Sequence, residues 1–365
     1  MKKLMRIAAA PISLDVLLRG QLKFFNNYYE VIAVASPNEI IHRKISEREG
    51  VRTVELKIER KISLLEDLKS LIKLYFLFRR EKPDIVHSLT PKAGLLSMVA
   101  AKAANVPVRI HTFTGLIFPW RKRAVSMLLK TMDRLTCMAA TNVIPEGQGI
   151  RKELITHSIT NKLSAVLANG NINGVDLEYF KPVPSTFERS FTRFIFVGRV
   201  VRDKGIEELK EAFERLNNAE LIIVGPFEQN LNPLNEDCYK WVREGKGVTS
   251  VGFKEDIRPY LADADVLVLP SHREGFPNTP LQAGAMGLPT IATDICGCNE
   301  IIINGITGLL VEPRNADHLY EAMKLLSENL VLRKEMGLKA RVHIAEKFSH
   351  WNVWDALLHF YQNVS

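Results

Sequence analysis

The sequence contains few cysteines and lacks a long uninterrupted hydrophobic run. The 365 residues include four cysteines, Cys137, Cys238, Cys296 and Cys298. They are too few and too scattered for a disulfide framework, and the pair Cys296 and Cys298 has no second pair with which to bind zinc. A reducing cytoplasm is therefore the expected location.

No segment approaches the roughly 20 consecutive apolar residues of a membrane-spanning helix. The apolar start imitates a signal peptide, but Pro11 and Asp15 interrupt it and no small-residue cleavage site follows, so we expect a buried strand. A hydrophobic content of 46% and a charged content of 25% argue against disorder, and the length favours two domains.

Positive charge is concentrated in the first half of the chain. Residues 1–182 hold 29 lysines and arginines against 16 acidic residues, whereas the remainder holds 20 against 25. No aromatic and basic RNA motif and no basic recognition helix accompanies this excess, so nucleic acid is not the expected partner. The excess favours contact with an anionic membrane surface, and a solvated basic face is the alternative.

Short apolar runs alternate with amphipathic segments along the chain. The expected strands lie at 5–10, 29–36, 84–89, 106–113, 142–145, 193–198, 219–225, 247–253, 265–270, 289–294 and 308–313. The expected helices lie at 16–25, 63–80, 92–104, 122–140, 205–216, 256–262, from 279 onward, and near the C-terminus. This alternation predicts an α/β fold with two doubly wound, Rossmann-like parallel sheets.

A polar segment at 182–190 separates the two series of strands. We therefore predict an N-terminal domain at 1–182 and a C-terminal domain at 183–345. The helix at 346–365 is expected to pack back toward the N-terminal domain.

The segment 270–287 follows an expected buried strand and turns sharply into a helix. Thr279, Pro280 and Gln282 have the pattern of an N-cap, a proline at the first helical position and a capping-box partner. The unpaired amides of such a helix start favour an anion such as a diphosphate. Glu274 beside them would accept hydrogen bonds from uncharged hydroxyls, and the combination indicates a nucleotide-sugar.

A second motif lies where the strand at 193–198 meets the next helix. Gly198 allows the backbone to turn, and Arg199 and Lys204 can converge on one anion. Two surface cations in solvent are the alternative interpretation.

With these motifs the sequence resembles glycosyltransferase family 4, whose members are retaining and have the GT-B fold, two Rossmann-like domains facing a central crevice. The family is marked by a glutamate, seven residues and a second glutamate. Glu274 matches the first, and Gln282 occupies the second position, where the family acid bonds the ribose. Gln282 can also be interpreted as a capping residue only. The resemblance covers nearly the whole chain and is strongest at 193–315.

The resemblance implies a role for several residues on the donor side. Glu274 would position the sugar, and Arg199 and Lys204 would stabilise the departing diphosphate as the catalytic set. The donor-binding residues implied are Gly198, Gly275, Phe276, Asn278, Thr279, Gln282, Phe253, Lys254 and Glu300. Phe276 can also be a core residue, and Glu300 can cap the next helix.

In the N-terminal domain the resemblance places acceptor-side residues on loops after the strands. They are Arg19, Gly20, Lys92, His111 and Thr114. Lys92 could meet an acceptor phosphate or be a surface lysine. Many relatives carry a histidine where Thr114 aligns, so either His111 takes that role or no residue does, and His111 can simply be packed.

Asp263 and Asp265 match the D-x-D metal motif of the other large transferase fold. They precede their strand, at the wrong end of a parallel sheet, so we expect no bound metal and no cofactor. Transfer is expected to be metal-independent.

Aromatic and basic residues occur together at 116–123. Phe118 and Trp120 could insert shallowly into an anionic membrane, or the segment could be a core edge beside a charged face. The helix at 64–80 is interpreted as a packed helix that covers a sheet.

The sequence thus predicts a cytoplasmic, membrane-peripheral retaining glycosyltransferase. It would move a sugar from a nucleoside diphosphate donor, expected to be UDP-linked, to a lipid-diphosphate-linked saccharide of a cell-surface polysaccharide. A nucleotide-sugar epimerase of the same fold and a catalytically silent nucleotide-sugar-binding subunit of a membrane complex are the alternatives.

Overall fold

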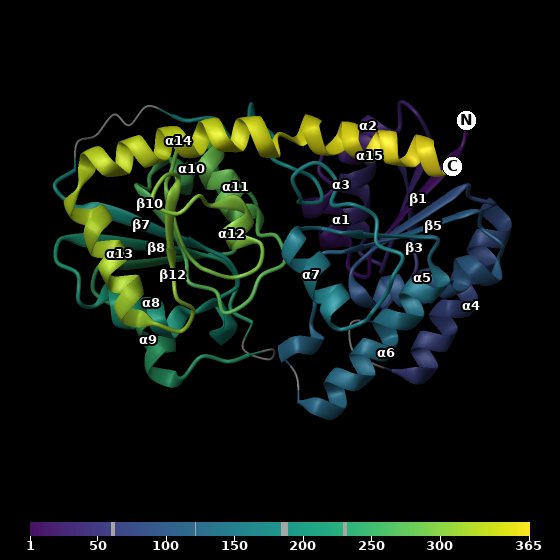
Figure 1. The fold of residues 1–365 in the computed structure, drawn as a ribbon, viewed down its shortest axis with the longest axis horizontal. Coiled ribbons are helices and arrows are strands. Elements are labelled where there is room, and N and C mark those ends of the chain that lie inside the picture. The colour runs from purple at the N-terminus through teal and green to yellow at the C-terminus, as the bar shows by residue number, and fades with distance from the viewer. Residues whose placement is uncertain (60–62, 121, 184–188, 229–231) are drawn as a thin grey trace. The chain divides into compact units, whose positions relative to one another are not determined.

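The computed structural model describes residues 1–59, 63–120, 122–183, 189–228 and 232–365. The chain forms two compact α/β units (Figure 1). Unit 1 comprises Met1–Asn173 and Trp351–Ser365, and unit 2 comprises Gly174–His350. The division lies earlier than the expected boundary at 182, and the C-terminal helix belongs to unit 1.

Unit 1 contains a parallel six-stranded sheet in the order β3-β2-β1-β4-β5-β6. Its strands are β1 (Lys3–Ile7), β2 (Glu30–Ala35), β3 (Arg52–Glu55), β4 (Ile85–Leu89), β5 (Val108–Phe113) and β6 (Asn142–Pro145). Strands β1, β2 and β4 are buried almost throughout, which explains their continuous apolar sequences.

The helices of unit 1 are α1 (Pro11–Leu17), α2 (Gln21–Phe25), α3 (Glu39–Glu49), α4 (Leu64–Glu81), α5 (Pro91–Ala103), the short η1 (Phe118–Trp120), α6 (Arg123–Ala139), α7 (Gln148–Thr156) and α15 (His350–Val364). The single helix expected at 16–25 is wrong. Gly20, with φ 76°, separates α1 from α2 and leaves room for the ring of Trp354 on α15.

A buried polar network attaches α15 to the sheet of unit 1. The Tyr361 hydroxyl lies 3.1 Å from Arg6 Nη1 and 2.5 Å from His87 Nδ1, and Arg6 Nη1 also donates to Gln21 Oε1 at 2.7 Å. Arg6 and Tyr361 are fully buried, and burial raises the pKa of Tyr361 to about 12. The hydroxyl therefore stays protonated at neutral pH.

Unit 2 repeats the same plan, with a parallel sheet in the order β12-β11-β10-β7-β8-β9. Its strands are β7 (Thr192–Val197), β8 (Ala219–Val224), β9 (Val248–Gly252), β10 (Val266–Leu269), β11 (Thr290–Thr293) and β12 (Gly308–Val311). Its helices are η2 (Arg202–Lys204), α8 (Ile206–Phe213), α9 (Glu236–Glu244), α10 (Arg258–Ala262), α11 (Asn278–Ala285), α12 (Cys298–Ile301), α13 (Ala316–Glu328) and α14 (Leu330–Phe348).

In both units the chain runs from the first strand outward to one edge of the sheet, and then returns to the other side of the first strand and continues to the opposite edge. In unit 2 the strands on either side of this reversal are β7 and β10. Ligands of doubly wound folds bind beyond the carboxyl ends of the strands at such a switch point. The predicted pair of Rossmann-like domains is confirmed.

Candidate active site

The loops after β7 and β10 lie side by side at the switch point of unit 2. The two strands are parallel neighbours, with Phe194 opposite Val266 and Ile195 opposite Leu267. The motif at Gly198–Lys204 and the loop that carries Glu274 therefore leave the same edge of the sheet, as the sequence predicts.

Gly205 allows these two loops to approach closely. It has φ 70°, and a Cβ atom there would lie 1.9 Å from the carbonyl oxygen of Pro270. Both the left-handed backbone and the contact exclude a side chain at this position.

The central contact of the site joins the two loops. Lys204 Nζ lies 2.5 Å from Glu274 Oε1, and the two side chains are only 16% and 11% exposed. Partial burial strengthens this ion pair relative to one at the surface. The predicted diphosphate cation and the predicted sugar-binding carboxylate are therefore in direct contact.

Residues on either side of these two form further bridges between the loops. Arg273 Nη2 lies 2.6 Å from Asp203 Oδ2, and the His272 amide donates to the Asp203 carbonyl at 2.9 Å. His272 Nε2 lies 2.8 Å from Glu208 Oε1 at the start of α8. Sequence reasoning missed this brace, although each member is adjacent to or close to a motif residue.

The charges of the site converge on Asp203. Burial raises its pKa, but the positive charges of Arg273, Arg199 and Lys204 outweigh burial and hold the pKa below its usual value. Arg199 thus acts electrostatically on the same carboxylate as Lys204, and its own guanidinium lies 3.1 Å from Glu228 Oε2. The two predicted cations belong to one electrostatic neighbourhood.

A third loop, after β11, packs against the Glu274 loop. A Cβ atom on Gly297, which has φ 81°, would lie 2.1 Å from the carbonyl oxygen of Gly275. Cys296 Sγ lies 3.9 Å from the same oxygen and 4.0 Å from Glu300 Oε1. This packing places Glu300 beside the predicted donor loop.

The helix after Glu274 does not begin as expected. Helix α11 begins at Asn278, its N-cap is Pro277, and no side-chain hydrogen bond caps it. Thr279 lies inside the first turn, so the predicted capping box between Thr279 and Gln282 is wrong. The helix begins two residues earlier than the pattern predicts, so Pro280 is the third helical residue rather than the first, and proline is tolerated throughout the first turn.

The remaining donor-side residues differ in exposure. Phe276 is buried and packs on Phe348 with a ring separation of 5.7 Å, in keeping with a core residue. Phe253 is exposed, and the ammonium of Lys254 lies 6.0 Å from the centre of the Tyr260 ring. Gly198 directly follows β7, and its amide donates to the Val224 carbonyl.

The two acids of the D-x-D motif form ion pairs and hydrogen bonds within unit 2. Asp263 forms ion pairs with both Arg189 and Arg193, and Asp265 accepts from the Arg193 amide at 2.8 Å. Among the residues that the structure describes, no group of three or more His, Cys, Asp or Glu side chains could hold a metal ion.

The predicted acceptor-side residues lie in unit 1. His111 is buried, its Nδ1 is 2.9 Å from the Ser88 hydroxyl, and burial lowers its pKa to about 3, so the ring is packed and neutral. Lys92 is not the surface lysine of the alternative interpretation, because it is nearly buried and 2.6 Å from Asp67 Oδ1.

The three remaining acceptor-side predictions are Arg19, Gly20 and Thr114. The Arg19 carbonyl accepts from Asn173 Nδ2 at 3.0 Å, and the Gly20 amide donates to Glu49 Oε1 at 3.0 Å. Thr114 is half-buried after β5.

The predicted insertion of Phe118 into a membrane is wrong. Phe118 is fully buried, with its ring 5.0 Å from that of His157. An aromatic residue beside basic residues can serve either environment, and here it fills the core below α6. The side chain of Trp120 lies outside the described part of the structure.

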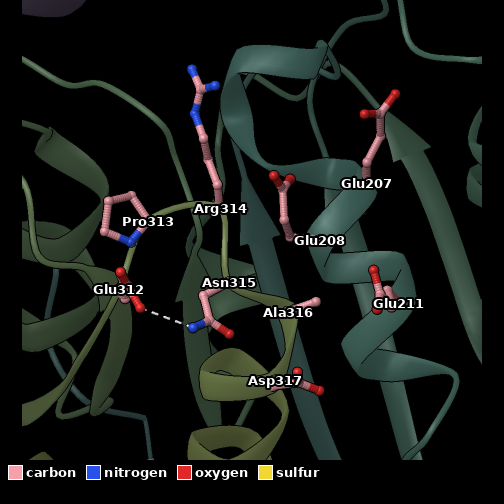
Figure 2. A pocket seen from close by; sticks show the side chains of 9 residues that line it. All are labelled: Glu207, Glu208, Glu211, Glu312, Pro313, Arg314, Asn315, Ala316 and Asp317. Atoms are coloured by element: carbon pink, nitrogen blue, oxygen red, sulfur yellow. Dashed lines mark hydrogen bonds between the residues drawn. The ribbon is translucent and has the colours of Figure 1, made fainter.

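A pocket of about 490 Å³ lies between the start of α8 and the loop before α13 (Figure 2). Its lining residues are Glu207, Glu208, Glu211, Glu312, Pro313, Arg314, Asn315, Ala316 and Asp317. With five carboxylates against one arginine, the lining has a net negative charge, which would repel a diphosphate. The pocket is therefore distinct in charge from the Lys204 and Arg199 region, although His272 connects the two through Glu208.

The comparisons with known proteins agree with this architecture. Residues 192–329 match the family described as glycosyl transferases group 1, and residues 14–146 match glycosyl transferase 4-like. The solved structure of Anabaena HepE in complex with UDP-glucose superposes with a TM-score of 0.84 at 18% identity, covering the whole of both chains. The fold is that of a GT-B glycosyltransferase.

Two curated relatives are similar over most of their length. The capsular polysaccharide biosynthesis glycosyltransferase CapM of Staphylococcus aureus is 30% identical, covering 94% of this chain and 93% of that protein. The UDP-Gal:α-D-GlcNAc-diphosphoundecaprenol α-1,3-galactosyltransferase of Escherichia coli is 33% identical, covering 75% of this chain and 74% of that protein. The chain belongs to glycosyltransferase family 4 and is a glycosyltransferase.

Proposed function

We propose that this glycosyltransferase is retaining and moves a sugar from a UDP-sugar to a lipid-diphosphate-linked saccharide in cell-surface polysaccharide synthesis. The observation that carries the proposal is the contact between Lys204 and Glu274 at the switch point of unit 2. It pairs a cation suited to a diphosphate with a carboxylate suited to sugar hydroxyls. The E. coli relative, whose name specifies a UDP-Gal donor and a diphosphoundecaprenol-linked acceptor, supports the choice of substrates.

In the proposed reaction the acceptor hydroxyl attacks the anomeric carbon on the face that the diphosphate leaves. The bond between that carbon and the phosphate oxygen breaks, and its electron pair stays on the phosphate. The acceptor proton passes to the leaving phosphate oxygen. Glu274 holds the sugar in position, and Lys204 and Arg199 stabilise the negative charge as it develops. The proposal assigns no metal a part in this step.

We assign Gly198, Gly275, Asn278, Thr279, Gln282 and Glu300 to the donor pocket as part of the same proposal. The first turn of α11 adds backbone amides, which suit an anion at a helix start. His111 is left out of the acceptor site because its ring is fully buried. Lys92, whose ammonium pairs with Asp67 as Lys204 pairs with Glu274, is kept as a candidate for an acceptor phosphate.

The location proposed is the cytoplasmic face of the plasma membrane, which the basic unit 1 would contact. Among the described residues, no helix is both long and apolar enough to cross a bilayer. A lipid-linked acceptor and an excess of lysine and arginine both favour a peripheral association.

The test is turnover with a panel of UDP-sugars and lipid-diphosphate-linked acceptors. Lys204→Ala and Glu274→Ala are expected to remain folded and lose about 100-fold or more in kcat. Lys210→Ala is the control, since Lys210 forms a pair of 2.8 Å with Glu214 on the surface of α8. Undiminished turnover in both site variants would refute the assignment. The anomeric configuration of the product tests retention, and product formation from donor alone would indicate an epimerase.

A further inference from the structure

Three neighbouring helices cover one part of unit 1. Helix α5 packs against α4 on one side and against α6 on the other, so the three lie side by side (Figure 1). Helix α5 is buried along most of its length. The outer faces of α4 and α6 are therefore the ones that remain open.

The outer face of α4 is apolar over four turns. Leu64, Leu68, Ile72 and Phe76 are spaced by four residues and are 84%, 54%, 48% and 63% exposed. This spacing places the four side chains in one row along the helix. A row of this kind is not the packed, sheet-covering face that the sequence led us to expect for all of α4.

Helix α6 presents a second apolar face. Its exposed apolar residues are Val125, Met127, Leu128, Leu135 and Met138. Single exposed apolar residues are common on protein surfaces, but two groups of them on the helices that flank α5 need an explanation.

The charges around these faces are almost all positive. Exposed basic residues that no ion pair among the described residues neutralises include Lys73, Arg79, Lys122, Arg123 and Arg134. The acidic residues of the two helices are turned away or neutralised. Asp67 pairs with Lys92, Glu66 with Lys69, and Asp133 is buried.

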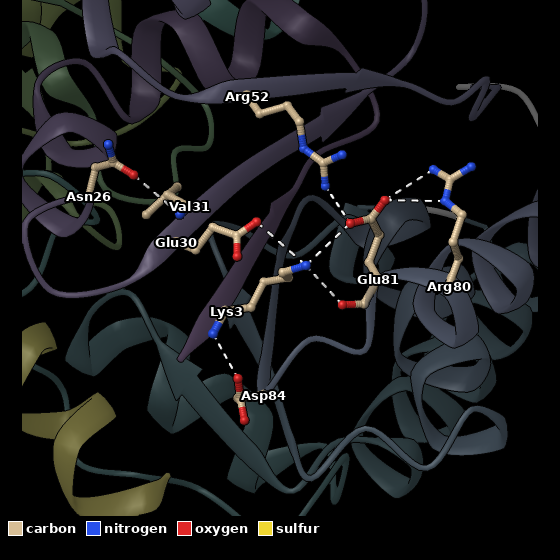
Figure 3. A network of polar contacts seen from close by, with 8 residues as sticks. All are labelled: Lys3, Asn26, Glu30, Val31, Arg52, Arg80, Glu81 and Asp84. Atoms are coloured by element: carbon tan, nitrogen blue, oxygen red, sulfur yellow. Dashed lines mark hydrogen bonds and ion pairs between the residues drawn. The ribbon is translucent and has the colours of Figure 1, made fainter. Parts of the chain in front are cut away.

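Glu81 at the end of α4 shows the same arrangement. It points toward the amino ends of β1 and β3, where it pairs with Lys3 and Arg52. It also pairs with its neighbour Arg80 (Figure 3). Its carboxylate is therefore directed away from the apolar row.

We propose that the outer faces of α4 and α6, together called the α4–α6 face, bind an anionic lipid bilayer. Leucine, isoleucine, phenylalanine and methionine would enter the acyl boundary while lysine and arginine contact lipid phosphates. The proposal builds on the proposed function, because a lipid-linked acceptor has to be reached at the bilayer. It moves the membrane contact from Phe118, which is buried, to two helix faces that are open.

The test measures co-sedimentation of the purified protein with vesicles. Vesicles contain phosphatidylcholine alone or phosphatidylcholine with phosphatidylglycerol. The wild type is expected to bind the anionic vesicles, and added salt should weaken binding. The double variant Ile72→Glu/Phe76→Glu should lose at least about tenfold in partition coefficient, because the new carboxylates oppose both insertion and the lipid charge.

The matched control is Leu338→Glu/Val342→Glu on α14, where two exposed apolar residues are also spaced by four. This variant should bind like the wild type. Equal loss in both variants, or no loss in the α4 variant, would overturn the proposal. A wild-type dimer that the α4 variant converts to monomer, with vesicle binding unchanged, would also overturn it and assign the face to a second copy.

Turnover separates this proposal from the proposed function. The α4 variant should retain transfer to a water-soluble short-chain acceptor and lose at least about tenfold with the acceptor in anionic vesicles. Equal transfer in both formats would contradict the docking proposal alone. Absence of transfer by the wild type in either format would contradict the proposed function, while the vesicle-binding result would stand independently. Thermal unfolding of the variants near the wild-type temperature verifies folding.

Discussion

Lys204 Nζ lies 2.5 Å from Glu274 Oε1, joining the loops that follow β7 and β10. In the free protein the two groups that we assign to the diphosphate and to the sugar therefore neutralise each other. A donor has to exchange this pair for two contacts of its own. The exchange costs little if both partners are replaced, and costs more if either charge is left buried alone.

The brace beside this pair is expected to matter for activity. Arg273→Ala removes the contact with Asp203 and should lower kcat by about 10- to 100-fold, because the Glu274 loop loses its fixed position. Arg273→Lys should recover part of the loss. Steady-state kinetics measure both. Arg202→Ala is the control, since Arg202 lies in the same short helix as Asp203 but pairs with Glu207 at the surface. Wild-type kcat in Arg273→Ala would show that the brace is dispensable.

The close approach at Gly205 gives a prediction about stability. Gly205→Ala should destabilise the protein by about 3 kcal/mol or more, because it adds a collision with the Pro270 carbonyl to the left-handed backbone. Gly305→Ala has a similar φ of 75° and open space around its Cβ, so it should cost only about 1 kcal/mol. Urea unfolding compares the two. Equal costs would mean that the loops can separate freely.

Gln282 occupies the position of the second family glutamate. Because no side chain caps α11, exchanging Gln282 should leave the free energy of unfolding unchanged. A carboxylate bonds hydroxyls more strongly than an amide, so Gln282→Glu should lower the KM for the donor several-fold and Gln282→Ala should raise it. The same KM in all three proteins would remove Gln282 from the donor site.

The buried apolar strands could be predicted from the sequence because their patterns are local. The same holds for the motif that contains Arg199 and Lys204 and for the segment that contains Glu274. Strand β3 and helix α3 were missed, since β3 is partly exposed and short and α3 is rich in charged residues. At the break, Gly20 lies against the ring of Trp354, more than three hundred positions along the chain. Such long-range contacts are not encoded in any local window.

The site shows the same limit. The sequence predicted that Lys204 and Glu274 meet around one sugar diphosphate, but the brace of Arg273 with Asp203 required knowing that β7 and β10 are neighbours. His111 was a candidate because of its position after a strand, yet its ring is fully buried. Burial of a single polar side chain is set by packing from several elements at once.

Asp133 on α6 gives a pH prediction. Burial raises its pKa to about 7 in the folded protein, whereas an unfolded aspartate has a pKa of about 3.9. The unfolded chain therefore releases this proton first as pH rises from 4 to 7, and the free energy of unfolding falls over that range. Asp133→Asn should stabilise the protein by about 1 to 4 kcal/mol above pH 7, and the gain should vanish toward pH 4.

Chemical unfolding at several pH values tests this prediction. Asp355→Asn on α15 is the control, because that carboxylate is exposed. A gain in Asp133→Asn that is independent of pH would contradict the assigned cause.

The most direct test of the account is calorimetric titration of UDP and of the UDP-sugar that supports turnover into the wild type, Lys204→Ala and Glu274→Gln. If Lys204 holds the diphosphate and Glu274 the sugar, Lys204→Ala weakens both ligands, whereas Glu274→Gln leaves UDP affinity equal or higher and removes the advantage of the sugar. Unchanged affinities for both ligands in both variants would contradict the claim that these two residues meet around one donor.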